Sequence, residues 1–335
     1  MQGPVKKNTP RAKNHPEIGP FPYMTVEMQQ ESMTFKDFVE RFKTEKDCRE
    51  FFFKMRWPSG FVCPKCGHNE YSFINFRNLY QCRQCGHQAS VTAGTIMHKS
   101  HTGLREWFLA IFLVVNDKRG ISASQLSKTI GVSYYTAWLM LHKLRDAMAQ
   151  RDQRYLLGGK VEMDDAFFGA PVEGGRRGRG TDKTPAIIEL EVNEQGHPEY
   201  MKAEVVEAVN GETIVEIAKR TIEPDAEVYT DGLNSYEKLS SEGYEHHAEN
   251  FDTKKNPDHL HWLHTIISNM KAFIGGTYHG LDKKHLQRYF DEFCYRFNRR
   301  KFEGQLFHRL LSACAEGTFI TYKQIIGTDS TQVFA

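Results

Sequence analysis

The chain carries two nearly identical copies of a short metal-binding pattern, which constrains its fold more than any other feature. The copies are Cys63-Pro64-Lys65-Cys66-Gly67-His68 and Cys82-Arg83-Gln84-Cys85-Gly86-His87. In each copy, two thiolates lie on one tight turn, and the glycine lets backbone N–H groups point at the sulfur atoms. Two such turns supply four thiolates to one tetrahedral Zn²⁺ without an open coordination position. The sequence therefore predicts a zinc ribbon, in which structural zinc is bound by Cys63, Cys66, Cys82 and Cys85.

Two alternatives to this site are disulfides and histidine ligands. Paired Cys-x-x-Cys spacing in a chain of 335 residues, with no export signal at its start, favours metal over disulfides and predicts a cytoplasmic protein. His68 and His87 could each replace a cysteine, although the symmetric set favours four thiolates. The longest apolar run, 107–115, is too short to cross a bilayer and predicts a buried helix.

Residues 121–145 follow the pattern of a DNA-binding helix-turn-helix. Ser122 and Ser133 can cap two helices, and Gly131 supplies a left-handed residue between them. The second helix is predicted to expose side chains suited to DNA, of which we expect three to make contact: Tyr134, Tyr135 and Lys143. An ordinary helical hairpin is the alternative. The net charge of +2 excludes a histone-like polycation, so DNA contacts must come from local clusters.

Two aspartates lie in or after apolar strands that are far apart in the sequence. Asp164 lies in the strand predicted at 160–168, and Asp231 follows the strand predicted at 226–230. The order of an RNase H-like core is completed by strands at 186–192 and 200–206 and a helix at 211–220. In that core the first and fourth strands are neighbours, which brings the carboxylates together. Because close carboxylates repel unless cations lie between them, the pattern predicts a divalent-metal site for phosphodiester chemistry.

Each aspartate has a structural alternative. Asp165 follows Asp164 and points to the opposite face of the strand, so one of the two is an ordinary sheet acid, and we favour Asp164 as the ligand. Asp231-Gly232 could be a turn before a helix cap at Asn234 or Ser235.

At these residues the chain resembles the bacterial zinc-ribbon insertion-sequence transposases of the DDE type, whose catalytic domain is RNase H-like. The resemblance extends from about Thr34 to Gly317 and includes Lys271 and motifs at 176–180, 275–280 and 284–300. It implies a transposase that binds the terminal inverted repeats of its element, nicks the 3′ ends by metal-dependent hydrolysis and joins each 3′-OH to target DNA. It also implies Mg²⁺ or Mn²⁺ in the catalytic site, double-stranded DNA as partner, and a homo-oligomer, expected to be a dimer, near the nucleoid.

The chain departs from the family pattern at one catalytic position. Seven residues before Lys271 the family has a third acid, but this sequence has His264. A neutral imidazole can bind Mg²⁺ or Mn²⁺, and Mn²⁺ is less averse to nitrogen, so we predict Asp164, Asp231 and His264 as the metal ligands. The alternative is a helix-face histidine without a metal role, with the third ligand supplied by Asp258 or Glu292.

Basic residues of the catalytic half are predicted to bind DNA phosphate. Lys271 lies two helical turns after His264 on the same face. A glycine-interrupted basic loop contributes Arg176, Arg177 and Arg179, for which a solvated hairpin is the alternative. At the end of a later helical stripe we expect further contacts from Arg299 and Arg300.

The predicted organisation leaves two rival functions. One is a DNA-binding regulator with an inactive RNase H-like core, suggested by the loss of the third acid, and the other is a nuclease that cuts without joining. The patterns divide the chain into a flexible arm (1–33), a helical lead-in with the zinc ribbon (34–100), a helix-turn-helix region (101–150), an α/β catalytic domain (155–317) and a C-terminal tail (318–335).

Overall fold

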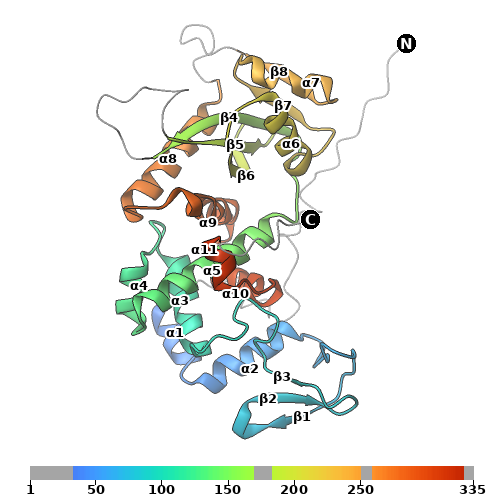
Figure 1. The fold of residues 1–335 in the computed structure, drawn as a ribbon, viewed down its shortest axis with the longest axis vertical. Helices are drawn as coiled ribbons and strands as arrows, with labels where there is room; N and C mark the ends of the chain where they lie inside the picture. Colours follow the sequence, from blue (N-terminus) through green and yellow to red (C-terminus); the bar gives the residue numbers. More distant parts are fainter. Residues whose placement is uncertain (1–32, 170–182, 250–258, 328–335) are drawn as a thin grey trace.

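The computed structural model describes residues 33–169, 183–249 and 259–327. The predicted arm at 1–33 lies outside these ranges except for its last residue, and so do Arg176, Arg177, Arg179 and Asp258. The described elements form an elongated molecule, with the cysteine-rich sheet at one end, a helical region in the middle and a larger sheet at the other end (Figure 1).

The cysteine-rich end consists of two helices and a small antiparallel sheet. Helices α1 (Phe35–Arg41) and α2 (Glu45–Arg56) each begin with a threonine capping box, at Thr34 and Thr44. The sheet has the order β1 (Tyr71–Ile74), β2 (Leu79–Cys82) and β3 (Gln88–Ala89). Aromatic rings join helix to sheet, since Phe53 of α2 stacks on Tyr80 with ring centroids 4.8 Å apart. The predicted helices and hairpin are confirmed, and β3 is an additional strand.

The middle of the molecule contains the predicted helix-turn-helix. Helices α4 (Ala123–Ile130) and α5 (Tyr134–Asp152) are capped by the side chains of Ser122 and Ser133. Gly131 between them has φ 75°, the left-handed conformation that its position requires. Helix α3 (Leu104–Asn116) holds the apolar run, and most of that run is buried. None of the helices in the described ranges is long and apolar enough to cross a membrane.

The larger sheet has five strands in the order β6-β5-β4-β7-β8. Strand β4 pairs antiparallel with β5 and parallel with β7, while β5–β6 is antiparallel and β7–β8 is parallel. This is the predicted RNase H-like arrangement, with the first and fourth strands adjacent at the centre. The strands and the crossover helix are β4 (Lys160–Phe168), β5 (Thr184–Val192), β6 (Pro198–Val205), α6 (Gly211–Thr221), β7 (Glu227–Thr230) and β8 (Glu245–Ala248).

Helices cover both faces of this sheet. Odd-numbered residues of β4, such as Val161 and Met163, share a core with α6. Even-numbered residues, such as Ala166 and Phe168, share a core with α8 (His261–Thr277) and α9 (Leu286–Asn298). Because side chains alternate along a strand, every even-numbered residue of β4, Asp164 included, faces the α8 side.

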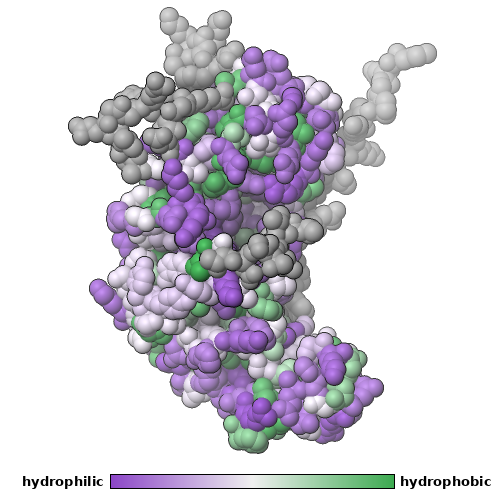
Figure 2. All heavy atoms as spheres, in the orientation of Figure 1, coloured by the Kyte–Doolittle hydropathy of each residue, from purple (hydrophilic) through white to green (hydrophobic). Residues whose placement is uncertain are grey.

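Helix α10 (Leu306–Glu316) corrects the predicted domain boundary at residue 317. The helix buries Phe307, Leu310 and Leu311 in the same core as α1, α2 and α3, so it belongs to the N-terminal half. Further short elements are α7 (Lys238–Ser241), α11 (Tyr322–Ile326) and 3-10 segments at Asn75–Arg77, Asn234–Tyr236, Lys283–His285 and Arg300–Gln305. On the face drawn in Figure 2, hydrophobic residues form small separate patches among hydrophilic ones.

Helix α5 connects the two halves through a buried ion-pair network with α9. Arg145 of α5 lies 2.8 Å from Glu292 of α9, and both side chains are only 2% exposed. Arg296 pairs with the same carboxylate at 2.7 Å. Burial acts to raise the pKa of Glu292, but the two arginines outweigh it and hold that pKa below its usual range. Removing one partner from such a pair costs about 3–5 kcal/mol, so this contact fixes α5 to the catalytic half.

Candidate functional site

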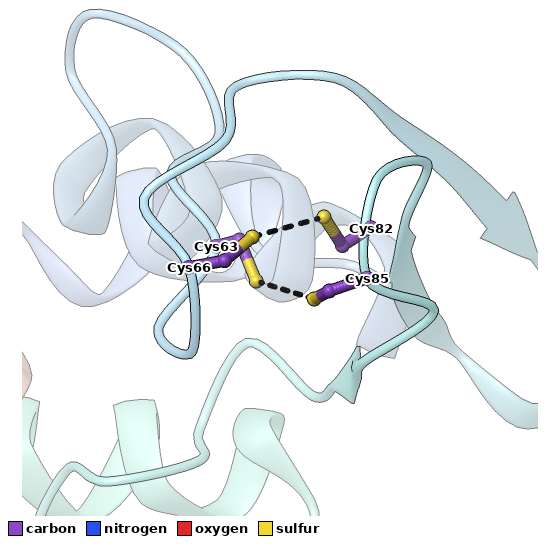
Figure 3. A group of neighbouring side chains, drawn as sticks. All are labelled: Cys63, Cys66, Cys82 and Cys85. Atoms are coloured by element: carbon purple, nitrogen blue, oxygen red, sulfur yellow. Dashed lines mark hydrogen bonds between the residues drawn. The ribbon is translucent and has the colours of Figure 1, made fainter.

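The two cysteine turns of the ribbon have the same backbone geometry. In one turn the N–H of Cys63 donates to the carbonyl of His68 and that of Gly67 donates to Cys63, at 2.8 and 2.9 Å. In the other turn Cys82 and Gly86 make the equivalent bonds at 2.9 and 3.0 Å. Figure 3 shows the four cysteine side chains converging from the two turns.

The spacing of the four sulfur atoms fits a tetrahedral zinc ion. The Sγ atoms of Cys63 and Cys85 lie 3.7 Å apart, and those of Cys66 and Cys82 lie 3.6 Å apart. A Zn–S bond of about 2.3 Å in a tetrahedron separates neighbouring sulfurs by about 3.8 Å. Burial acts to raise the pKa of Cys63, but backbone N–H groups of Lys65 and Cys66 outweigh it and lower that pKa. At Cys66, by contrast, a backbone N–H acts to lower the pKa, but burial and the neighbouring thiols outweigh it and raise that pKa. The arrangement supports structural zinc at the predicted residues.

Asp164 and Asp231 lie at neighbouring positions on the two central parallel strands. Met163 of β4 is in register with Thr230 of β7, so the next residue of each chain is an aspartate. Asp231 also accepts a long hydrogen bond of 3.4 Å from the backbone N–H of Leu233, which keeps it in the turn after β7. The turn predicted as its alternative is thus present, and it places Asp231 beside Asp164. We call the place where the central strands β4 and β7 carry these two aspartates the acidic edge.

His264 of α8 reaches the same edge. Its Nε2 lies 3.4 Å from Oδ2 of Asp164, and the two side chains are 49% and 16% exposed. The hydrogen bond with Asp164 raises the pKa of His264, and the charges of Asp164, Glu162 and Asp231 act in the same direction against partial burial. Residues from a strand, a turn and a helix therefore meet at one partly open place.

The ligand atoms at the acidic edge are of types that bind a divalent metal, but they do not lie close together. Two carboxylates and an imidazole are suitable ligands for Mg²⁺ or Mn²⁺. Among the described residues, only Cys63, Cys66, Cys82 and Cys85 have ligand atoms all within 4.8 Å of one another. The atoms of Asp164, Asp231 and His264 are thus more widely spread than in the zinc site.

Lys271, on the same helix as His264, lies near the end of β4. Its Nζ is 5.6 Å above the ring of Phe168 at the end of β4. Partial burial of its ammonium lowers the pKa of Lys271, and the nearby charge of Lys183 lowers it further, whereas Asp164 acts against them. Lys183 directly precedes β5 and packs against Gly169, and sequence reasoning did not single it out. Its position before a strand paired with Asp164's strand was the signal available.

Three of the basic residues predicted to contact DNA are buried or bonded within the protein. Lys143 is 8% exposed, not surface-exposed as expected. Arg299 is fully buried and pairs with Asp152 at 2.7 Å. Arg300 donates to backbone carbonyls of β6, including that of Glu199 at 2.8 Å. These positions contradict the expected phosphate contacts.

The exposure of two tyrosines and the ion pairs of Glu292 bear on the remaining predicted site residues. Tyr134 and Tyr135 at the start of α5 are 59% and 51% exposed. Glu292, the described alternative for the third ligand, is held by Arg145 and Arg296 between α5 and α9, so it is not available at the acidic edge.

Comparisons with known proteins agree on both halves of the chain. Two family models match, an ISXO2-like transposase domain at residues 156–298 and a transposase zinc-ribbon domain at residues 43–88. The chain is 27% identical over 223 residues to an uncharacterized protein in transposable element ISH50 of Halobacterium salinarum, covering 61% of this chain and 73% of that protein. It is 25% identical over 118 residues to an uncharacterized transposase-like protein of Haemophilus influenzae, covering 35% of this chain and 94% of that protein.

A solved structure also matches, the Mos1 transposase paired-end complex with left transposon end. The match has a TM-score of 0.20 and 11% identity, and it covers 63% of this chain and 79% of that one. This likeness is too weak to support any inference, so the RNase H-like assignment rests on the strand order and pairing described above.

Proposed function

The chain belongs to the insertion-sequence transposases that join a zinc ribbon to an ISXO2-like transposase domain, and from this premise we propose how it acts. It binds the terminal inverted repeats of its element, nicks the 3′ ends and joins each freed 3′-OH to target DNA. The observation that carries this proposal is the meeting of Asp164, Asp231 and His264 at one edge of the central strands. A linear element has two ends, so we propose that two copies of the chain act together.

We propose that some residues of the acidic edge bind metal and that nearby residues bind DNA. Asp164, Asp231 and His264 would hold Mg²⁺ or Mn²⁺, which, when bound, lowers the pKa of water and stabilises charge on phosphate oxygens. Lys271 lies near enough to Asp164 for their charges to interact, and Lys183 lies near Lys271, so the two ammonium groups supply positive charge for the DNA backbone, a contact that is independent of base sequence. Tyr134 and Tyr135 are exposed at the start of the second helix of the helix-turn-helix, where we propose that they contact the DNA ends.

A strand-joining assay tests the proposed function. Purified protein is mixed with duplexes carrying the DNA ends that flank the gene, a target plasmid, and Mg²⁺ or Mn²⁺. We expect covalently joined products with either metal and none with a chelator. Cut ends without joined product would favour the rival nuclease. End binding without cutting would favour the rival regulator, which is suggested by the loss of the third acid at position 264.

His264 gives a prediction that combines substitution with pH. Its imidazole must be neutral to bind metal, and its pKa is raised above the ordinary value of about 6.5. The joining rate should therefore fall as pH decreases through this raised pKa. His264→Ala should lose most activity, by about tenfold or more. His264→Glu should keep some activity, shift preference toward Mg²⁺ and move the acid limb to lower pH.

Joining rates measured from pH 5.5 to 9 with each metal check this prediction. The control is His261→Ala, one turn earlier on the same helix. If the His264→Ala protein joins DNA at nearly the wild-type rate, His264 is not a ligand.

A further inference from the structure

The first turn of α8, which ends at His264, has little local support. Its N-cap residue, Leu260, has a left-handed backbone with φ 50° and makes no side-chain cap bond. By contrast, the N-cap residues of α5 and α6 are Ser133 and Asn210, whose side chains accept hydrogen bonds from backbone N–H groups. The first N–H groups of a helix have no partners within the helix, so those of α8 need acceptors from water or from another element.

Glu162 of β4 lies where such an acceptor is needed. It is two residues before Asp164, so both side chains are on the face of β4 that packs against α8. The side chain of Glu162 is buried, with only 8% of the residue exposed. The backbone N–H of Leu263, in the first turn of α8, favours the charged form of the Glu162 carboxylate and so holds its pKa down, and His264 follows Leu263 directly.

The buried carboxylate of Glu162 has few other polar partners. Its Oε2 has no hydrogen-bond partner among the described residues. Burial raises the pKa of Glu162, while Lys160, the Leu263 N–H, His264 and His261 favour its charged form. Lys160 itself lies over the ring of Tyr229 at 4.3 Å. Placing an incompletely bonded carboxylate in a core costs free energy, so the contact with α8 must offset that cost.

We propose that Glu162 is a positioning residue, whose carboxylate caps the first turn of α8 from the neighbouring strand and thereby sets His264 against Asp164. A carboxylate at a helix N-terminus gains both from the N–H bond and from the helix dipole. The inference rests on the proposed function, because the position of His264 matters for joining only if His264 serves in the site. The contact between Glu162 and α8 exists with or without that function.

Three substitutions separate the reach of the side chain from its charge. Glu162→Gln keeps the length and one acceptor oxygen but loses the charge. Glu162→Asp keeps the charge but is shorter by one methylene, so it cannot reach Leu263 from the same backbone position. Glu162→Ala loses both. Glu189→Ala is the matched control, because Glu189 is a buried acid of the same sheet that bonds Thr221 of α6 on the opposite face.

Hydrogen–deuterium exchange of the metal-free protein tests the contact without any activity. In the Asp and Ala variants we expect amide exchange to increase at the start of α8, residues 261–266, and to remain unchanged in α6. The Gln variant should exchange like the wild type, and Glu189→Ala should loosen α6 instead. Unchanged exchange at 261–266 in both the Asp and Ala variants would overturn the proposal. If the Ala variant does not fold, the Asp and Gln pair decides.

Joining kinetics test the consequence. Misplacement of a reacting group by about 1 Å can cost about 100-fold in rate, so we expect the Asp and Ala variants to lose about 10- to 100-fold in the joining rate at saturating DNA. Their dissociation constant for the ends should stay within about twofold, and the Gln variant should keep most activity. Equal loss in the Gln and Ala variants would overturn positioning through the helix N–H. A wild-type protein that joins no DNA would refute the proposed function and leave the exchange result unaffected.

Discussion

Asp164→Asn and Asp231→Asn are each expected to abolish cleavage and joining while DNA-end binding stays nearly unchanged. Both carboxylates would hold metal, not DNA, and they lie at adjacent positions on the two central strands. Mutation of the outer-shell partners of metal ligands costs about 10–100-fold, so loss of a direct ligand should exceed about 100-fold. Joining assays and band-shift titrations with the same DNA ends measure the two effects separately.

Asp165→Asn is the matched control for this experiment. Asp165 is adjacent to Asp164 in the chain but lies on the opposite face of β4, toward the α6 side. Its substitution should leave the joining rate within a few-fold of wild type. Substantial joining by either the Asp164 or the Asp231 variant would refute the acidic-site assignment.

The purified chain is expected to contain about one zinc ion, and Cys82→Ser should release it and unfold the ribbon. Cys82 is 1% exposed and lies in β2 two residues after Tyr80, whose ring packs on α2. Structural zinc contributes about 10–16 kcal/mol in zinc-finger peptides, so the loss should spread into the packing of α2 and weaken DNA-end binding. Elemental analysis, circular dichroism and band-shift titration provide the three measurements.

Cys48→Ser serves as the control for zinc. Cys48 is fully buried in the same core but has no paired cysteine, so its substitution can reduce stability without releasing zinc. A disulfide among Cys63, Cys66, Cys82 and Cys85, or protein purified without zinc, would contradict the prediction.

Sequence patterns predicted the elements whose local chemistry is distinctive. The cysteine turns have a fixed spacing, the caps at Ser122 and Ser133 accept bonds from their own helices, and β4 is an apolar run with clear ends. The order of these elements also predicted that β4 and β7 are neighbours, and the sheet confirms this. Such features depend on residues close in the sequence or on a fold order already recognised.

Features that depend on distant contacts were not predicted. Strand β8 is short and mostly polar, so nothing in Glu245–Ala248 marks it as a strand until β7 is present to pair with it. Arg299 is a residue of the type that binds DNA phosphate, but in the structure it is buried in an ion pair with Asp152 of another helix. The link between Glu162 and α8 likewise joins residues about 100 positions apart, which no local pattern reports.

The return of α10 to the N-terminal half has a consequence for synthesis of the chain. Ribosomes release the N-terminal segment first, yet the core around α1, α2 and α3 lacks Phe307, Leu310 and Leu311 until the last part of the chain emerges. Burying each of these side chains contributes on the order of 1.5–3 kcal/mol. The nascent DNA-binding half therefore matures only after the catalytic half has been made. Any shortened product that ends before residue 306 leaves this apolar surface uncovered and lacks part of the core of its N-terminal half.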